Sequence, residues 1–379
     1  MYTRFLASEL KQKWFSGKVI LLTGARQTGK TTLVKAFLEA EGLKDQTRYF
    51  NCDNITDREL LRGKDLDFLI QLVGKAQVVF IDEGQKVQGI GETLKLLVDH
   101  YGQQKQVIVT GSSSMNLLNQ TQEPLTGRKW VYHLYPLSLE EIYPNGDLLS
   151  AIKGLEERLI YGSYPEIVTT LGNGDKAERL AELTSSYLYK DIFEFQQIKN
   201  PDVLFRLLKA LALQIGNEVA YNELAALLGI DKNTVERYVD LLEKNFVLFR
   251  LPPYFQNKRK ENSKMRKIFF YDNGVRNALL NNFLPLDSRN DVGALWENFM
   301  IVERFKYRSS RRIGADAFFW KNYPGAEVDL VEERDGKLYG YEFKWSPTKA
   351  VFKSPAAWQQ IPNTEFQCIH RENFAGFAF

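Results

Sequence analysis

The chain has 379 residues, of which 44% are hydrophobic and 26% are charged. These are ordinary globular values, so the composition excludes a disordered or fibrous chain, and about one domain per 150 residues predicts two or three domains. The formal net charge is only +3, so the charge of the whole molecule says little about binding to nucleic acid, and any such signal has to come from local clusters.

Cysteine content and hydropathy favour a cytoplasmic protein. Cys52 and Cys368 are too few and too far apart to indicate a disulfide framework or a zinc site. The N-terminal segment 1–22 has no small-residue cleavage site, and no stretch approaches the ~18 apolar residues of a membrane span. We therefore expect a reducing compartment and no membrane contact.

Short apolar runs alternate with helical patterns in residues 1–150. The runs lie at 19–22, 78–81 and 107–109, and polar residues or glycines bound each of them. Such alternation is typical of parallel strands connected by helices. The pattern predicts an α/β domain with a parallel sheet covered by helices.

A phosphate-binding loop follows the first run. The segment has the form G, four residues, G-K-T, and consists of Gly24, Ala25, Arg26, Gln27, Thr28, Gly29, Lys30 and Thr31. Thr32 then opens a predicted helix at 32–43 and belongs to the same nucleotide site. The glycines let backbone N–H groups face the phosphates, and the helix N-terminus adds positive charge. Lys30 is expected at the β- and γ-phosphates of ATP, and Thr31 at Mg²⁺.

The second run ends in two acids, Asp82 and Glu83. In this kind of fold both lie beside the γ-phosphate and the metal. We expect Asp82 to hold Mg²⁺, directly or through water, and Glu83 to polarise the attacking water. A strand that ends in solvated acids is the alternative.

Two further features follow the third run. Thr110 or Ser112, at the end of the strand, can sense the γ-phosphate, although hydroxyls and glycine are also ordinary turn residues. Arg128 comes later, in L-T-G-R, and can neutralise transition-state charge in its own subunit or in a neighbouring one. A surface arginine is the alternative for Arg128.

The region 151–284 has a helical pattern that contains helix-turn-helix spacing at 222–238. Gly229 lies in the turn, and Asp231 begins a second helix that is predicted to run to about 245. A strand at 246–251 follows. This order predicts a winged-helix module.

Basic residues follow that strand, namely Lys258, Arg259, Lys260, Lys264, Arg266 and Lys267. They predict a basic wing that contacts phosphates, with Thr234, Arg237 and Tyr238 near bases. A structural winged helix that serves as a lid or a protein-interaction surface is the alternative.

Residues 285–379 predict a small α/β domain, with a helix around 296–305 and strands at 318–320, 328–332 and 338–343. A polar turn at 332–337 separates the last two strands.

Asp329 and the set Glu342-Phe343-Lys344 resemble the acid, then E-x-K pattern of restriction-type nucleases. Alternation puts Glu342 and Lys344 on one face of their strand. Asp329 and Glu342 are then expected to bind a metal, with Lys344 orienting the water and Glu297 completing the site. A hairpin with exposed charges is the alternative.

Together these motifs resemble a family of prokaryotic AAA-type P-loop ATPases with a winged-helix region and a C-terminal nuclease-like (PD-(D/E)xK-type) domain of unassigned function. The resemblance spans essentially the whole chain and is carried also by residues 80–87, 127–128 and 161–166. Gly84 stands where an apolar residue is more usual, and Gly162-Ser163 replaces a glycine pair.

Two functions fit this reading. The first is a Mg²⁺-dependent ATPase that acts as a nucleotide-driven switch or motor on DNA or a partner, with a possible metal-dependent nuclease domain. The second is a nucleotide-controlled interaction protein whose nuclease-like fold is inactive. The expected ligands are ATP and Mg²⁺. DNA contact through the winged-helix region and the C-terminal domain, and a homo-oligomer, are further hypotheses.

Overall fold

The computed structural model describes residues 2–112, 117, 120–187, 200–256, 265–322, 325–347 and 353–379. The chain forms two compact units. The first comprises Met1–Pro136 with Lys244–Phe246, and the second comprises Leu137–Glu243 with Val247–Phe379.

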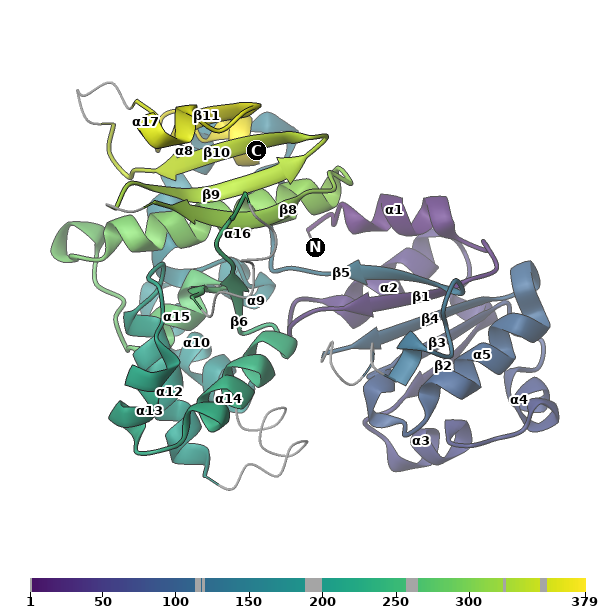
Figure 1. Cartoon of the computed structure of the whole chain (residues 1–379). Helices are drawn as coiled ribbons and strands as arrows, with labels where there is room; N and C mark the ends of the chain where they lie inside the picture. The colour runs from purple at the N-terminus through teal and green to yellow at the C-terminus, as the bar shows by residue number, and fades with distance from the viewer. Residues whose placement is uncertain are drawn as a thin grey trace. The chain divides into compact units, whose positions relative to one another are not determined.

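The first unit is built on a five-stranded sheet of order β2-β3-β4-β1-β5, in which all neighbouring strands are parallel (Figure 1). Its strands are β1 (Val19–Thr23), β2 (Thr47–Asn51), β3 (Val78–Asp82), β4 (Gln106–Gly111) and β5 (Lys129–His133). This confirms the predicted α/β fold with a parallel sheet. The pattern of apolar runs missed β2 and β5, the two edge strands.

Helices cover both faces of this sheet, as a parallel sheet requires. They are α1 (Leu6–Lys13), α2 (Lys30–Ala40), α3 (Ile55–Leu61), α4 (Leu66–Val73) and α5 (Ile90–Tyr101), with short 3-10 turns at Lys44–Gln46, Gly84–Lys86 and Gly102–Gln104. Alternate residues of β1 enter different cores. Val19 and Leu21 pack with α3, α4 and α5, whereas Ile20 and Leu22 pack with α1 and α2.

The second unit begins with a helical region and a two-stranded antiparallel sheet, β6 (Leu248–Leu251) with β7 (Lys267–Phe270). The helices are α7 (Leu139–Ile142), α8 (Leu148–Tyr161), α9 (Pro165–Thr169), α10 (Asn173–Tyr187), α12 (Pro201–Leu213), α13 (Tyr221–Leu228), α14 (Lys232–Lys244) and α15 (Asn273–Leu279), with 3-10 turns at Pro144–Gly146 and Leu286–Ser288. Among the described residues, no helix of either unit is long and apolar enough to cross a membrane.

A four-stranded sheet of order β11-β10-β9-β8 completes the second unit, with α16 (Val292–Ser310) packed along it (Figure 1). Its strands are β8 (Asp316–Lys321), β9 (Glu327–Arg334), β10 (Lys337–Phe343) and β11 (Thr364–Ile369), and two short helices follow β10 and β11, α17 (Ala356–Gln359) and α18 (Ala375–Ala378).

The hairpin between β9 and β10 is tighter than the sequence suggested. Strand β9 runs to Arg334, and the turn consists of Asp335 and Gly336, both with positive φ, which suits a two-residue hairpin. Glu332 therefore lies inside the strand and not in a polar turn. Its side chain is fully buried.

Candidate functional site

The loop between β1 and α2 has a backbone that only glycine permits at its start. Gly24 has φ 148°, and a Cβ there would lie 2.3 Å from the carbonyl oxygen of Leu134. Gly29, with φ 93°, precedes the first residue of α2. The loop therefore turns sharply and delivers its last residues to a helix N-terminus, where N–H groups lack partners within the helix.

Lys30 lies within the curve of this loop and is only 6% exposed. Its Nζ donates to the carbonyl oxygens of Gly24, at 2.9 Å, and Ala25, at 2.8 Å. The Thr28 hydroxyl also donates to Ala25 O, whereas Gln27 and Thr32 are exposed and Arg26 is half-buried. A positive group surrounded by loop backbone at a helix N-terminus is suited to binding an anion.

Asp82 ends β3 and receives hydroxyl donors from three other segments. Thr31 Oγ1 lies 2.9 Å from each carboxylate oxygen, Tyr49 OH lies 3.1 Å from Oδ2, and Thr110 donates to Oδ1. Burial, and then the charge of Asp82, raise the pKa of Tyr49, which keeps this donor protonated. A carboxylate beside a threonine hydroxyl is the hard oxygen donor set that suits Mg²⁺, so Thr31 and Asp82 fit that ion.

Glu83, the next residue, is held by two side chains from the strand edge. Its backbone has φ 54°, and its Oε2 accepts hydrogen bonds from Ser112 Oγ, at 3.0 Å, and from Gln85 Nε2. The Glu83 N–H donates to Thr110 Oγ1. Thr110 and Ser112 are both buried and hydrogen-bond with the two acids, and the expectation that one of them senses the γ-phosphate stays a prediction.

In the second unit, Lys267 lies among the acids that were expected to hold a metal. The sequence placed Lys267 in a basic wing, but it is only 4% exposed. Its Nζ lies 3.2 Å from Glu297 Oε1 and 3.9 Å from Asp329 Oδ1, and it also pairs with Glu327. The single ammonium group therefore offsets only part of the negative charge of these three acids.

Glu342 and Lys344, the two charged residues of the E-x-K set, form an ion pair with each other. Lys344 Nζ lies 2.7 Å from Glu342 Oε1, and Asp329 Oδ2 accepts the backbone N–H of Phe343. Burial first, and then neighbouring acids, raise the pKa of Glu297 to about 8 and that of Asp329 to about 6. Such shifts report carboxyl groups that lack sufficient positive charge.

The predicted metal site of Asp329, Glu342 and Glu297 is not supported. Across the described ranges, no group of three or more His, Cys, Asp or Glu residues has an arrangement that could hold a metal ion. The physical reason is that ammonium groups already occupy the positions beside these carboxylates. A metal role for Asp329, Glu342 and Glu297 stays a prediction, and their pairing with lysines does not favour it.

The helix-turn-helix segment forms as α13 and α14, joined at Gly229, which has φ 68°. Asp231 caps α14 by accepting from the N–H of Thr234 at 2.9 Å, and the Thr234 hydroxyl also binds it. Arg237 is exposed, but Tyr238 is buried and faces the core, so Tyr238 is not available to a base. Lys258, Arg259, Lys260 and Lys264 lie outside the described residues.

Comparison with known families agrees with the loop geometry. Residues 16–143 match the family model described as "AAA domain". This part of the chain is similar to AAA-type P-loop domains and is called the AAA domain below. The match supports ATPase-type nucleotide binding. Residues 152–285 and 292–369 match two models described as "Domain of unknown function", DUF8612 and DUF4143.

The chain is also similar in sequence to several other proteins. An uncharacterised protein of Mycobacterium tuberculosis is 27% identical over 353 residues, which cover 93% of this chain and 76% of the relative. An uncharacterised protein of Methanocaldococcus jannaschii is 26% identical, and the match covers 83% of this chain and 73% of the relative. General secretion pathway protein A of Aeromonas hydrophila is 30% identical over 158 residues, which cover 33% of this chain and 28% of that protein.

A solved signal-transduction ATPase with a tetratricopeptide repeat sensor, from Pyrococcus horikoshii, matches with a TM-score of 0.31 and 13% identity. The match covers 83% of this chain and 48% of that chain, so this chain spans about half its length. A score this low shows no shared arrangement of the whole chain.

Arg128 lies at the wrong end of the AAA domain's sheet to reach its own nucleotide. Its carbonyl accepts from the N–H of Val19, the first residue of β1, whereas the phosphate loop follows the last. A strand of this length spans about 15 Å. The guanidinium pairs on the surface with Asp99, at 2.6 Å. A role in cis is therefore not supported, and a role in a neighbouring subunit stays a prediction.

Three residues that contact the phosphate loop or the acids after β3 were not identified from the sequence. Tyr49 was missed because β2 was not recognised, and Gln85 because a glutamine after two acids has no distinctive spacing. Arg4 donates to the carbonyl oxygens of Thr28, at 2.9 Å, and Tyr135, at 2.6 Å. It thereby braces the phosphate loop, although no pattern near the N-terminus signals that role.

The two departures from the family pattern have steric explanations. A Cβ on Gly84 would lie 2.4 Å from Val109 Cγ1, so an apolar side chain has no room there. A Cβ on Gly162 would lie 1.9 Å from Asp272 Oδ1, whereas Ser163 only donates its N–H to Asp272. The first glycine of this pair is thus required, and the second is not.

Proposed function

We propose that the AAA domain binds and hydrolyses ATP in a Mg²⁺-dependent reaction. The observation that carries the proposal is the position of Thr31 Oγ1, 2.9 Å from both oxygens of Asp82, at the residue after the buried Lys30. This arrangement joins the phosphate loop to the acidic strand end, as nucleotide hydrolysis requires.

Each group has a distinct role in this proposal. Backbone N–H groups of the loop and Lys30 bind the phosphates, and Thr31 with Asp82 would hold Mg²⁺, which supplies charge neutralisation when it is bound. Glu83 accepts a proton from, or polarises, the attacking water. Ser112 and Gln85 keep its carboxylate in one orientation through their hydrogen bonds, which preorganises the site.

We further infer that nucleotide turnover switches a binding surface and that the C-terminal domain does not cleave nucleic acid. The contacts of Lys267 with Glu297 and Asp329 favour this reading, because a metal would have to displace a buried ammonium. DNA contact through α14 and a homo-oligomer remain part of the hypothesis, since Arg237 is exposed on that helix.

The test is steady-state ATP turnover by the purified chain, with and without DNA. Mg²⁺-dependent turnover that disappears in Lys30→Ala supports the ATPase, and turnover without Mg²⁺ contradicts it. Stimulation by DNA identifies DNA as the regulated partner.

Cleavage is tested separately, with Mn²⁺ and single-stranded DNA, double-stranded DNA and RNA. We expect no cleavage by the wild type. Cleavage that is lost in Asp329→Ala would overturn the assignment of an inactive nuclease-like domain, whereas cleavage that survives in Asp329→Ala comes from another source.

A further inference from the structure

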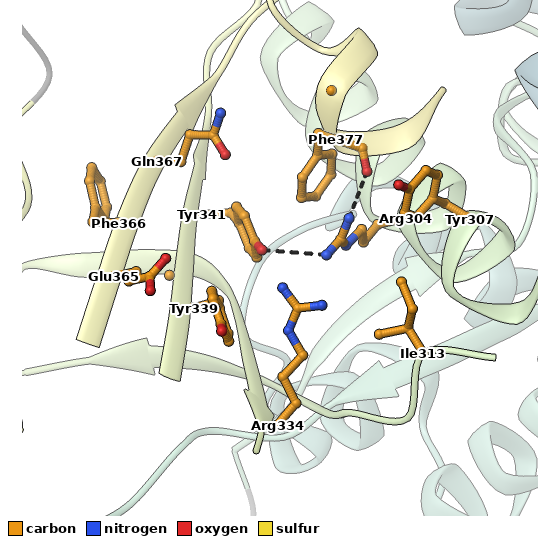
Figure 2. Close-up of a pocket in the computed structure, with 12 residues that line it drawn as sticks. Arg304, Tyr307, Ile313, Arg334, Tyr339, Tyr341, Glu365, Phe366, Gln367 and Phe377 are labelled. Atoms are coloured by element: carbon orange, nitrogen blue, oxygen red, sulfur yellow. Dashed lines mark hydrogen bonds between the residues drawn. The ribbon is translucent and has the colours of Figure 1, made fainter. Parts of the chain in front are cut away.

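A pocket of about 450 Å³ lies in the C-terminal domain, away from the acidic cluster (Figure 2). It is bounded by β10, β11, α16 and α18, and its lining includes Arg304, Arg334, Tyr339, Tyr341, Glu365 and Phe377. Successive side chains of a strand point to opposite faces, so Tyr339 and Tyr341 lie on the face opposite to Glu342. The pocket is thus separate from the E-x-K site.

The floor of the pocket carries an excess of positive charge. Glu332 is fully buried and receives two hydrogen bonds from Arg304, each of 2.9 Å, and one from Arg308, of 3.3 Å. Arg334 Nε lies 3.9 Å from the same carboxylate. Three guanidinium groups therefore share one carboxylate. Glu365 also lines the pocket, but it is paired with Lys337 at 3.5 Å.

Arg334 lies farther from Glu332 than Arg304 and Arg308 do. Its Nε is buried, and it makes no hydrogen bond within the described part of the chain. Figure 2 shows its guanidinium pointing into the pocket, toward Arg304 and Tyr341. Because Nε itself is enclosed by the protein, only the guanidinium nitrogens that face the pocket can meet a ligand, and an anionic ligand there would pair with their charge.

Aromatic rings provide the walls. The Arg334 guanidinium lies over the Tyr339 ring, 4.0 Å from its centroid, and the rings of Tyr341 and Phe377 pack together at 4.7 Å. Tyr307, which is half-buried, also lines the pocket, whereas the Phe366 ring packs on the opposite face of the sheet. Flat rings beside a guanidinium can bind a planar base by stacking.

We propose that this pocket binds a nucleoside monophosphate, with the phosphate on Arg334 and the base against the tyrosines. Two uncompensated guanidinium charges match a phosphate dianion better than a carboxylate, and guanidinium groups bind phosphate through paired hydrogen bonds. The volume lies within the range of about 300–1,000 Å³ that is typical of small-ligand pockets. The ligand is either a free mononucleotide or the 5′-phosphorylated end of a nucleic acid strand.

The test is calorimetric titration of AMP, GMP, CMP and UMP into the full-length Lys30→Ala chain, whose phosphate loop is disabled. The same titration into wild type saturated with a non-hydrolysable ATP analogue serves as a second measurement. We expect binding in both. Arg334→Gln should weaken it by about tenfold or more, because the charge-assisted hydrogen bonds to the phosphate are lost. Tyr339→Leu should weaken it by about tenfold, because the flat ring beside the base is lost.

Arg371→Gln is the matched control. Arg371 is exposed, lies over the Trp345 ring at 5.6 Å, and does not line the pocket. Its replacement should leave affinity unchanged. Circular dichroism melting confirms that each variant is folded, and Tyr339→Phe, which keeps the ring, should retain binding.

A second titration, with a 5′-phosphorylated oligonucleotide and its 5′-hydroxyl form, distinguishes a free mononucleotide from the end of a nucleic acid strand as the ligand. Binding of the phosphorylated form alone, lost in Arg334→Gln, assigns the site to strand ends and supports the proposal. Failure of all mononucleotides and strands to bind at millimolar concentration overturns it. Equal affinity for inorganic phosphate, or unchanged affinity in a folded Arg334→Gln, also overturns it. These results are independent of the ATPase, because the phosphate loop is disabled or saturated throughout.

Discussion

Thr31 Oγ1 contacts both carboxylate oxygens of Asp82 at 2.9 Å, although 51 residues separate the two in the chain. Parallel strands end at the same edge of the sheet, so the loop after β1 meets the acid at the end of β3. The same edge brings Tyr49, Thr110 and Ser112 to these acids. The contact therefore makes the phosphate loop and the acidic strand end one site.

Replacing Lys30 should abolish ATP binding, because its buried ammonium faces the phosphate position. We expect Lys30→Ala to lose about two orders of magnitude or more in affinity for ATP. Lys35→Ala is the control, since Lys35 is exposed on the same helix and outside the loop. Fluorescent-nucleotide titration measures both. Equal loss in the two variants would contradict a specific role for Lys30.

Glu83→Gln should keep ATP affinity and lower kcat by about 100-fold or more, because an amide cannot polarise water as a carboxylate does. Ser112→Ala should cause a smaller fall in kcat at unchanged KM, since it only frees the Glu83 side chain. Glu92→Gln, an exposed acid on α5, is the control. Unchanged turnover in Glu83→Gln would remove this residue from the mechanism.

Lys267→Met should make the chain responsive to divalent cations. Removal of the ammonium leaves Glu297, Glu327 and Asp329 without compensation, and breaking a buried pair costs about 3–5 kcal/mol. We expect a lower Tm that Mn²⁺ partly restores, with no effect of Mn²⁺ on the wild type.

Lys321→Met controls for loss of a lysine ion pair, because Lys321 pairs with Glu218 on the surface at 2.5 Å. Thermal melts with and without Mn²⁺ provide the measurement. Equal stabilisation of wild type and Lys267→Met would show that Lys267 does not compete with a metal.

Glu297 should make stability depend on pH. Burial, and then Asp329, raise its pKa from 4.5 to about 8, so the folded state retains a proton that the unfolded chain has lost. Its contribution is present below about pH 4.5 and is lost as pH rises through about 8. Wild-type Tm should therefore fall between about pH 5 and about pH 8.5 more than that of Glu297→Gln. Glu178→Gln, at an exposed position of α10, should keep the wild-type slope.

The predicted basic wing should contribute to DNA binding through contacts with phosphates. Replacing Lys258, Arg259 and Lys260 by alanine should weaken DNA binding mainly in its salt-dependent part, with the slope falling by about one per lost phosphate contact. Fluorescence anisotropy against salt measures this slope. Absence of DNA binding by the wild type at low salt would make this a protein-binding or lid surface.

The sequence by itself predicted the loop and the acidic strand end that form the candidate nucleotide site. The spacing of Gly24, Gly29 and Lys30 is local, because one turn and one helix start dictate it, and the apolar run before Asp82 identifies a buried strand. A few neighbouring residues determine the local backbone geometry and the burial pattern, so these elements could be predicted. The edge strand β2 was missed because its exposed residues weaken the apolar pattern.

Tertiary structure decided the role of charges that are distant in sequence. Lys267 belongs to a basic run, yet its strand pairing buries it beside Glu297 and Asp329, and Glu332 becomes the buried partner of Arg304. The E-x-K spacing brings Lys344 beside Glu342, although β10 ends at Phe343, but this spacing cannot indicate which cation from another segment packs against the acids. Spacing fixes which face a side chain occupies, whereas its charge balance depends on every element packed against that face.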